Sequence, residues 1–371
     1  MSRFDVAIIG AGMAGASIAA ELAPFCKVVL LEAEAQPGYH ATGRSAAFWS
    51  ETYGGQWVQP LSSASGPWLA NPPTSFNDTG FLSPRGEINI GRTEDWPALE
   101  RFAASFRDSG ITLDRLDRAA IDAQFDGFRP EWTDGIGIES CADIDVAALH
   151  QAYLRAARRN GAELRCNESV RALSRSACGW HVDSALAAIE ADVVVNAAGA
   201  WADQVGALAG AQPLGITPYR RTMLQVRLDH PVSLTVPLII DVNGGFYFKS
   251  DGAGGLWLSP HDETLSLPTD AAPEEIDIAI AIARLEDATT LRVAAVTHKW
   301  AGLRSFAPDR LPVYGFDSNV TGLYWCAGQG GFGIQTAPAA AKLVASQILG
   351  REPDPMIASL DPERYAPDRF T

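Results

Sequence analysis

The sequence predicts an α/β fold that begins with a β-strand–helix–β-strand unit. Three consecutive sequence patterns indicate this unit. Residues 6–9, Val-Ala-Ile-Ile, form a continuous apolar run, typical of a strand buried on both faces of a parallel sheet. A glycine-rich turn occupies residues 10–15, and small and apolar residues continue to Leu22, as in a helix packed closely on a sheet. Residues 27–31 form a second predicted strand, apolar from Val28 onward, which ends on Glu32. This order predicts a Rossmann-like unit.

The residue types in this unit suit a dinucleotide. Gly10 permits the tight turn, Gly12 lets the backbone approach a pyrophosphate, and Gly15 lets the helix pack closely on the strand. The N-terminus of the helix offers free N–H groups and a partial positive charge to the phosphates. Glu32 stands 22 residues after Gly10, where a carboxylate can accept hydrogen bonds from ribose hydroxyls. Because these parts occur in order within about 30 residues, the sequence predicts a dinucleotide-binding site.

Two further segments decide between FAD and NAD. Residues 38–47 are small and polar and follow the second strand, so they could run beneath an isoalloxazine ring. Residues 326–334 form a second glycine turn, which follows the apolar run 322–325 and precedes an alanine-rich helical pattern at 337–348. The N-terminus of that helix could face the negative charge that develops at the flavin N1–C2=O edge. An NAD dehydrogenase has no need of this second turn, so we expect FAD, bound without a covalent link.

Composition and charge exclude several classes of protein. The chain has 371 residues, enough for about two domains, and a net charge of −15, which opposes binding to nucleic acid. The five cysteines are scattered without a CxxC pair, and no residues have metal-ligand spacing, so we predict neither a disulfide framework nor a metal site. No apolar run reaches the roughly 20 residues that span a bilayer. We expect a cytoplasmic protein without a transmembrane segment, and a peripheral contact with the inner membrane stays open.

Ordered motifs spread over almost the whole chain carry a family resemblance. They occupy residues 36–40 with 42–47, 82–85 with Glu87, 142–145, 195–201, 300–306, and 329–331 with 333–336. On these motifs the chain resembles the D-amino-acid oxidase superfamily of FAD-dependent oxidoreductases. Within that superfamily it resembles the bacterial D-arginine dehydrogenase group.

The resemblance implies an interleaved architecture. A Rossmann-like FAD-binding domain would comprise residues 1–82, 143–213 and 296–371. An α+β substrate-binding domain with a mixed or antiparallel sheet would comprise residues 83–142 and 214–295. The strand-like patterns within the second domain agree with this division.

The resemblance also implies a reaction and the residues that serve it. A hydride equivalent would pass from Cα of a D-amino acid to flavin N5, and the product imine would hydrolyse to a 2-oxo acid and ammonia. The matched Arg221 and Arg304 would bind the substrate carboxylate, because a guanidinium makes two parallel hydrogen bonds to it. Arg220 competes with its neighbour for this role. Tyr53 and Tyr247 match positions that contact the carboxylate or close the pocket.

Other matched residues would lie at the substrate amine or at the cofactor. The resemblance implies that the carbonyl of Gly331 lies near the amine, Gln335 near the flavin or substrate, and the hydroxyl of Ser45 near flavin N5. The predicted cofactor-binding residues are Gly10, Gly12, Met13, Ala14, Gly15, Glu32, Ala33, Thr42, Gly43, Arg44, Ser45, Ala46, Ala47, Val170, Ala198, Gly199, Trp201, Arg304, Gly330, Gly331, Gly333, Ile334, Gln335 and Thr336.

Glu87 and Phe48 bear on the choice of substrate. A carboxylate at Glu87 on a pocket strand would pair with the guanidinium or ammonium of a long side chain and so favour D-arginine and D-lysine. A solvent-facing glutamate on an alternating strand is the other interpretation. Phe48 departs from the pattern, because the D-arginine dehydrogenase group has a histidine there. The loss of this imidazole removes a polar neighbour of the substrate amine, which puts the pH dependence and the substrate breadth in question.

The sequence leaves three hypotheses open. The first is an FAD-dependent D-amino-acid dehydrogenase that passes electrons to a quinone or another acceptor than oxygen. The second keeps the fold but acts on glycine, sarcosine, an opine-type amine or a 2-hydroxy acid, which all need an arginine for the carboxylate. The third is a non-catalytic FAD-bearing subunit of a larger dehydrogenase, and the complete set of substrate residues argues against it.

Overall fold

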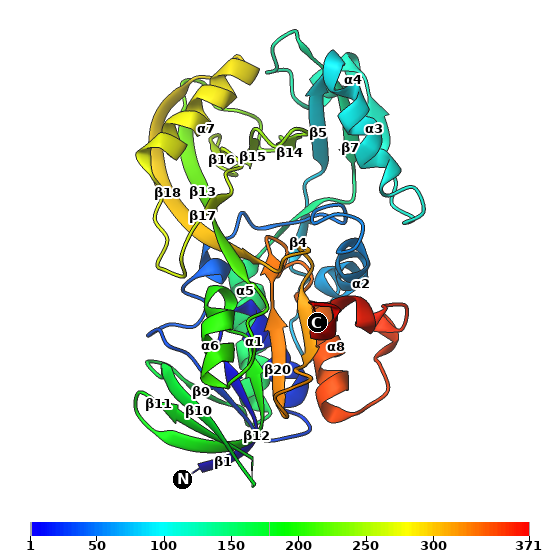
Figure 1. Cartoon of the computed structure of the whole chain (residues 1–371). Coiled ribbons are helices and arrows are strands. Elements are labelled where there is room, and N and C mark those ends of the chain that lie inside the picture. The colour runs from blue at the N-terminus through cyan, green and yellow to red at the C-terminus, as the bar shows by residue number, and fades with distance from the viewer. Residues whose placement is uncertain (1, 178, 371) are drawn as a thin grey trace.

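The computed structural model describes residues 2–177 and 179–370, and its strands form three β-sheets within those residues (Figure 1). An eight-stranded sheet lies in the lower half of Figure 1, and a ten-stranded sheet lies in the upper half. A three-stranded sheet, which includes β4, lies where the two halves meet. The sheets therefore separate the molecule into two layered halves around a shared middle.

The eight-stranded sheet contains the predicted β-strand–helix–β-strand unit. β1 (Ser2–Ile9) pairs in parallel with β2 (Val28–Leu31), and α1 (Met13–Leu22) connects them. All four residues of β2 are buried, as the apolar run predicted. β1 also pairs in parallel with β12 (Ala188–Asn196), so Ile8 lies beside Val195. The other strands of this sheet are β9 (Glu163–Arg165), β10 (Val170–Ser176), β11 (Gly179–Ser184), β19 (Val313–Phe316) and β20 (Leu323–Ala327).

The ten-stranded sheet is mixed. β5 (Glu87–Arg92) runs parallel to β14 (Leu238–Asp241), whereas β5 and β7 (Trp132–Ile138) are antiparallel. The other strands of this sheet are β6 (Asp114–Leu116), β13 (Thr217–Leu228), β15 (Tyr247–Ser250), β16 (Leu256–Ser259), β17 (Thr264–Leu265), β18 (Val293–Phe306) and β21 (Gln329–Gly330). Helices α3 (Trp96–Ala104) and α4 (Arg118–Gln124) pack beside β7, and α7 (Glu275–Ala288) packs on β13. The predicted α/β fold with a mixed sheet in its second part is confirmed.

The three-stranded sheet joins segments that are far apart in the chain. β8 (Ala142–Ile144) lies between β3 (Phe48–Trp49) and β4 (Leu82–Pro84), and both pairs are antiparallel. Two further helices are α2 (Gln59–Ala70) and α6 (Ala202–Leu208). Short 3-10 helices occupy Ala41–Arg44, Thr93–Asp95, Gly199–Trp201, Pro355–Ile357, Pro362–Tyr365 and Pro367–Phe370.

β18 bears on the predicted domain boundary at residue 296. The strand begins at Val293 and pairs with β13 as far as Phe306, so the boundary falls inside a continuous strand of the ten-stranded sheet. At its end, β18 pairs with β21 in the second glycine turn, through Ser305 and Gly330. One strand thus reaches from the outer part of the ten-stranded sheet to the glycine turn near the C-terminus. The exact division into domains stays a prediction.

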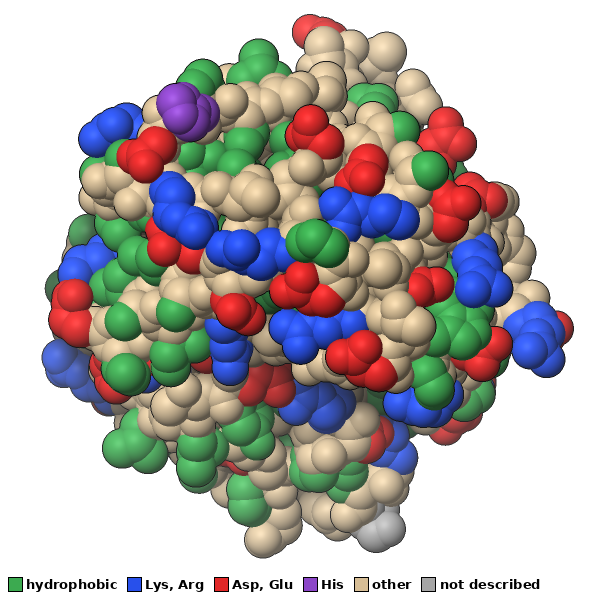
Figure 2. All heavy atoms as spheres, turned by 90° about the horizontal axis from the view of Figure 1, so that it is seen from above, with side chains coloured by type: hydrophobic (Ala, Val, Ile, Leu, Met, Phe, Trp, Pro, Cys, Tyr) green, Lys and Arg blue, Asp and Glu red, His purple; other side chains and the backbone are tan. Residues whose placement is uncertain are grey.

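The molecular surface mixes charges of both signs. On the face seen from above in Figure 2, lysine and arginine side chains alternate with aspartate and glutamate rather than gathering by sign. No helix in the described part of the chain is both long and apolar enough to cross a bilayer.

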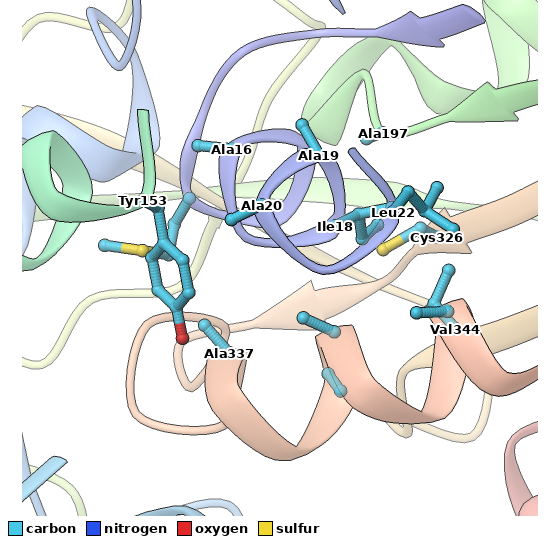
Figure 3. Packing of buried hydrophobic residues seen from close by; sticks show 14 of the residues in the cluster. Ala16, Ile18, Ala19, Ala20, Leu22, Tyr153, Ala197, Cys326, Ala337 and Val344 are labelled. Atoms are coloured by element: carbon cyan, nitrogen blue, oxygen red, sulfur yellow. The ribbon is translucent and has the colours of Figure 1, made fainter. Parts of the chain in front are cut away.

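The largest core cluster lies where α1 meets α5 (Val146–Arg159) and α8 (Ala337–Leu349). Figure 3 shows Ala16 and Ala20 of α1 beside Tyr153 of α5, with α8 below them. Small side chains on α1 let its neighbours approach closely, and close packing is what gives such a core its stability. This rigid support holds the start of α1, which follows directly on the first glycine turn.

Candidate active site

A single cavity of about 480 Å³ connects the first glycine turn with the ten-stranded sheet. Glu32 and Val170 line one part of it, Gly12 lies on the first turn, and Arg304 and Tyr247 line the part that faces the ten-stranded sheet. The predicted cofactor residues that line the cavity are Gly10, Gly12, Met13, Ala14, Glu32, Ala33, Thr42, Arg44, Ser45, Ala46, Ala47, Val170, Ala198, Gly199, Trp201, Arg304, Gly330, Gly331, Gly333 and Ile334. Segments from every part of the chain therefore converge on one elongated space.

The structure places four of the predicted cofactor residues behind this surface. Gly15 packs against the turn, and Gly43 donates its N–H to the carbonyl of Gly38. Thr336 is buried and its hydroxyl donates to the carbonyl of Phe332. The Gln335 amide donates to two backbone carbonyls and one hydroxyl, those of Ser50, Tyr53 and Ser62. Gln335 thus supports the loop that carries Tyr53, because its amide is already saturated by the protein.

The first glycine turn has the shape that a pyrophosphate requires. Gly10 has φ +99°, and a Cβ there would lie 2.6 Å from the carbonyl oxygen of Ala197. A Cβ on Gly15 would lie 1.9 Å from the carbonyl oxygen of Gly10. At Gly12, by contrast, a Cβ would meet only the Thr42 hydroxyl, at 3.2 Å, because this position faces the cavity. The missing side chain leaves a cradle at the N-terminus of α1, where backbone N–H groups can bind phosphate oxygens.

Glu32 and His150 hold the turn in place. One carboxylate oxygen of Glu32 accepts from the N–H of Ala11 at 2.9 Å, and the other from the N–H of Glu34 at 3.0 Å. Each oxygen keeps a lone pair for a ribose hydroxyl. His150 Nε2 lies 2.9 Å from the carbonyl oxygen of Ala11. Burial lowers the pKa of His150, so this imidazole is neutral at pH 7. Sequence reasoning missed His150, because a histidine inside an amphipathic helix gives no sign of which loop it reaches.

Arg44 anchors the loop that follows the second strand. Its Nη1 donates to the carbonyl oxygens of Ala271 at 2.7 Å and Ala301 at 3.1 Å, and its Nη2 pairs with Asp270. The carbonyl of Arg44 in turn accepts from the indole N–H of Trp300 at 3.1 Å. The cavity-lining loop is therefore tied to the ten-stranded sheet.

Arg304 lies at the far end of the cavity and carries a buried positive charge. Its Nη1 donates to the hydroxyl oxygen of Tyr53 at 2.5 Å, and its Nη2 lies 3.5 Å from the hydroxyl oxygen of Tyr247. A Cβ on Gly331 would lie 3.1 Å from the guanidinium carbon, so the glycine leaves room for this group. Among residues 2–177 and 179–370, no carboxylate lies within 4.0 Å of the Arg304 guanidinium. Burial alone would lower the pKa of Arg304, but Tyr53 and Tyr247 outweigh burial and raise it.

Arg221 lies beside Arg304, on the neighbouring strand. Its side chain is 4% exposed, its Nε donates to the carbonyl oxygen of Asp262 at 2.5 Å, and its Nη1 is buried without a partner in the described structure. Burial, followed by the charge of Arg304, lowers the pKa of Arg221. Arg221 also has carboxylate neighbours, with Glu263 Oε1 at 3.4 Å from its Nη2. The competing Arg220 pairs with Asp277 and Glu274. The structure thus brings Arg221 to the cavity and gives Arg220 a structural role.

Aromatic rings form the wall around these arginines. Phe48 lies edge-on to Tyr53, with ring centroids 4.9 Å apart, and to Tyr247 at 6.3 Å. The hydroxyl of Tyr247 donates to the sulfur of Met223 at 2.9 Å. Phe48, which stands where the resembled group has a histidine, thus gives this wall an apolar ring.

Glu87 lines a second cavity, of about 380 Å³, which Tyr53 also lines. The side chain is 3% exposed; Oε1 accepts from the amide of Asn89 at 2.8 Å, and Oε2 is buried without a hydrogen-bond partner in the described residues. Burial raises the pKa of Glu87, against the polar groups of Ser50 and Asn89, which lower it. The solvent-facing interpretation of Glu87 is therefore wrong, because the protein encloses this side chain almost completely.

His261 also lies at this site, and sequence reasoning missed it. Its ring meets the ring of Tyr247 edge-on with centroids 5.3 Å apart, and its Nδ1 is buried without a partner in the described residues. Burial first, and then the charges of Arg221 and Arg304, lower the pKa of His261 to about 2. His261 follows closely after the strand that pairs with Tyr247. Only the register of the sheet reveals that pairing, so the sequence alone could not place His261 here.

Metal ligands do not gather in the described residues: no group of three or more His, Cys, Asp or Glu side chains could hold an ion there. Cys26, Cys141, Cys166 and Cys326 are free thiols, and Cys178 lies outside the described residues.

Comparisons with known proteins agree with this geometry. Human dimethylglycine dehydrogenase is 28% identical over 242 residues, a match that covers 60% of this chain and 28% of that protein. The chain thus matches little more than a quarter of that relative's length. L-proline dehydrogenase from P. horikoshii has a TM-score of 0.86 at 21% identity, covering 100% of this chain and 98% of that one. Glycine oxidase from Geobacillus kaustophilus has a TM-score of 0.85 at 24% identity, with 99% and 98% covered.

The family model described as FAD dependent oxidoreductase (DAO) matches residues 5–347. The glycine cradle, the Glu32 carboxylate and the elongated cavity fit the cofactor that this description names. The chain therefore belongs to the DAO family of FAD-dependent oxidoreductases, and its cofactor is FAD.

Proposed function

We propose that this chain catalyses the FAD-dependent oxidative deamination of D-amino acids and prefers cationic side chains, as D-arginine dehydrogenases do. The substrate would lose its Cα–H bond and one amine N–H bond; bound FAD would supply the acceptor for two electrons and one proton, and the second proton would go to solvent. The imine that remains adds water and releases ammonia, which leaves a 2-oxo acid. The observation that carries this proposal is the buried Arg304, which no carboxylate of the described chain neutralises.

Arg304 favours an anionic ligand at the end of the cofactor cavity. A buried cation is costly unless it is paired, and a carboxylate matches a guanidinium with two parallel hydrogen bonds. Arg221 supplies a second guanidinium with a free Nη1, and Tyr53 supplies a hydroxyl at 2.5 Å from Arg304. A substrate carboxylate held there would present its Cα toward the part of the cavity lined by Ala46 and Gly331.

The second cavity supports a preference for cationic side chains. Glu87, which lines this cavity, has one carboxylate oxygen without a hydrogen-bond partner. Tyr53 lines the same cavity, and its hydroxyl accepts a hydrogen bond from Arg304, so it connects the two cavities. A guanidinium or ammonium group reaching past Tyr53 would give Glu87 the counter-ion that it lacks. Charge-assisted hydrogen bonds of this kind are about twice as strong as neutral ones.

The protein's part in the reaction is to bind, orient and exclude water. FAD, when bound, accepts the hydride equivalent, which is chemistry that the cofactor supplies. Arg304, Arg221 and the tyrosines would fix the carboxylate, and the carbonyl of Gly331 would accept a hydrogen bond from the amine. His261, with a pKa of about 2, is too weak a base to remove the amine proton. We therefore expect the neutral amine to be the reacting form, so that activity rises with pH as the substrate loses its proton.

The alternative is a smaller or secondary amine as substrate. It is favoured by the names of the similar proteins, which refer to dimethylglycine, glycine and L-proline. Those substrates also carry a carboxylate for Arg304, but they have no cationic side chain for Glu87. A quinone or another acceptor than oxygen, and a cytoplasmic location with or without a peripheral membrane contact, remain part of the proposal.

Anaerobic bleaching of the flavin separates these substrates. The holoenzyme is mixed without oxygen with the D- and L-forms of arginine, lysine, leucine and methionine, and with glycine, sarcosine and L-proline. We expect D-arginine and D-lysine to bleach the flavin fastest. Fast bleaching by sarcosine or L-proline, with none by D-arginine, would establish the alternative instead.

Glu87 variants give the matched control. Glu87→Gln keeps the shape and removes the charge, and we expect the preference for D-arginine over D-leucine to fall about tenfold or more, as a lost charge-assisted hydrogen bond implies. Glu100→Gln removes the same charge at an exposed position and should leave the preference unchanged. An unchanged preference in Glu87→Gln would refute the role of Glu87. Reoxidation of the reduced flavin by a soluble quinone, compared with oxygen, tests the acceptor.

A further inference from the structure

Lys249 is a buried lysine that the reaction above does not use. It lies on β15, two residues after Tyr247, and only 6% of it is exposed. Its ammonium donates to the carbonyl oxygen of Ala47 at 2.9 Å and to Asp143 Oδ1 at 2.7 Å, and it lies 5.0 Å from the centroid of the Trp257 ring. Both of these hydrogen bonds are thus made to groups inside the protein.

The ion pair with Asp143 does not by itself explain Lys249. Arg85 already neutralises the Asp143 carboxylate, to which its Nε donates at 2.9 Å and its Nη2 also donates. Two cations therefore share one anion in a mostly buried cluster. Burial lowers the pKa of Lys249, while Asp143 opposes that effect. A buried excess charge is retained only where it has a further partner, and the further partner here is the carbonyl of Ala47.

Ala47 has an unusual backbone conformation that needs support. Its φ is +56°, in the left-handed region that residues with a Cβ disfavour. Its N–H donates to the hydroxyl of Ser45 at 2.9 Å, and its carbonyl accepts from the N–H of Ile144 at 3.1 Å as well as from Lys249. Residues 45–47 all line the cofactor cavity, between the first glycine turn and Arg304.

This stretch of the cavity has to receive the reactive ring of FAD. The pyrophosphate belongs at Gly12, and the ring must contact a substrate that Arg304 holds, so the ring lies between those two points. Residues 45–47 border that interval. Because the Ser45 hydroxyl accepts from the N–H of Ala47, the conformation of Ala47 also sets the direction in which that hydroxyl can donate.

We infer that Lys249 is a positioning residue: its ammonium holds the carbonyl of Ala47 and thereby fixes the loop 45–47 against the flavin. The side chains of Tyr247 and Lys249 leave the same face of β15, since residues two apart on a strand point the same way. One strand therefore aligns a residue of the substrate site with a residue that holds the cofactor loop. The inference depends on FAD, not on which amine is oxidised.

FAD affinity and the visible absorption spectrum of the bound flavin test this inference without any substrate. Lys249→Met removes the ammonium and keeps a side chain that matches the lysine as far as Cε. We expect the Kd for FAD, titrated into apoprotein, to rise about tenfold, because a hydrogen bond to a charged group is lost. We also expect the visible bands of the bound flavin to shift, because the loop beside the ring has moved. Lys249→Arg, which can still donate to the Ala47 carbonyl, should restore most of both properties.

Two controls separate positioning from general stabilisation. Arg85→Met removes the other cation of the cluster, which makes no contact with Ala47, and should leave FAD affinity within about twofold. In the Ala47→Gly background, Lys249→Met should cost less affinity, because glycine adopts a positive φ without strain. The inference fails if Lys249→Met leaves the Kd and spectrum unchanged, or if Arg85→Met changes both equally. Should Lys249→Met not fold, Lys249→Gln takes its place with the same measurements and the same criteria.

Discussion

Two ionisable groups of opposite type are buried beside the two cavities, and each lacks a full partner within the described chain. Arg304 has phenol groups and no carboxylate beside it, and Glu87 has an amide on one oxygen and nothing on the other. Both groups therefore cost stability in the free protein and gain a partner when a ligand with both charges arrives. Buried ionisable groups without full partners are typical of binding sites, where a protein trades stability for function.

Removing the Arg304 charge should separate binding from folding. For Arg304→Met we expect kcat/KM for the amino-acid substrate to fall by about 100-fold or more, because truncating a buried charge partner costs about 2–5 kcal/mol. The apoprotein should be at least as stable as the parent, since a buried cation without a counter-ion is gone. Steady-state kinetics and thermal melts measure the two effects. Arg220→Met is the control: it breaks two ion pairs away from the cavity and should affect stability rather than KM.

The raised pKa of Glu87 predicts how stability depends on pH. In the pH range between its ordinary pKa and its raised pKa, the folded protein holds a proton that the unfolded chain has released. The free energy of unfolding therefore falls as pH rises through this range, and Glu87 stabilises the fold least at high pH. Glu87→Gln should melt a few degrees higher than the parent at pH 8 and show little difference at pH 4. A melting temperature that drops equally at both values would contradict this reading, and Glu100→Gln again supplies the exposed control.

At the scale of elements, the first strand–turn–helix unit follows from its sequence, whereas the second cavity does not. The unit is local: apolar runs, glycines and Glu32 lie within about 30 residues, and each has one backbone task. The second cavity is made by residues from loops, strands and α3, some of them separated by over a hundred positions, and their meeting depends on sheet register. Tyr247 and His261 face each other only because β15 and β16 pair in one particular way.

The glycines of the first turn should respond differently to the same substitution. Gly15→Ala puts a Cβ 1.9 Å from the carbonyl oxygen of Gly10, so we expect an apoprotein that is strongly destabilised or does not fold. Gly12→Ala meets only the Thr42 hydroxyl, at 3.2 Å, so the apoprotein should fold. Its methyl group would occupy the phosphate cradle, and the Kd for FAD should rise about tenfold or more, as the loss of a helix-terminus phosphate contact implies. Circular dichroism melts and FAD titration distinguish the two, and equal FAD affinity in Gly12→Ala would count against the cradle.

At the scale of the whole molecule, the cofactor cavity is where the two large sheets meet. Its lining comes from the first sheet through Gly12 and Glu32, and from the second through Arg221 and Arg304. The sequence motifs indicated both contributions, because each of them is a short, ordered pattern. They could not indicate that β18 continues unbroken through residue 296, since a strand that serves both halves has no composition change at the boundary.

FAD should therefore stabilise both halves together. At 100 times its Kd, a ligand that binds only the folded state adds about 2.7 kcal/mol to the free energy of unfolding, so the melting temperature should rise with FAD concentration. Hydrogen exchange should slow at the first glycine turn and also at Thr269 and Ala271, which line the cavity from the second half. Protection confined to the first half would show that the halves are not coupled through the cofactor.

The outer wall of the second cavity has a consequence for how such proteins diversify. Ala98, Arg101 and Phe102 of α3 form part of that wall, and α3 packs on β5 and β7, away from the glycine turns. Substitutions in this helix can reshape the space for a side chain while Arg304 and the FAD cradle keep their geometry. On the proposed function, α3 would tune the choice of substrate side chain, whereas the residues around the FAD cradle would stay unchanged. A mutant library confined to residues 96–104 is accordingly the first one to screen for variants that accept other substrates.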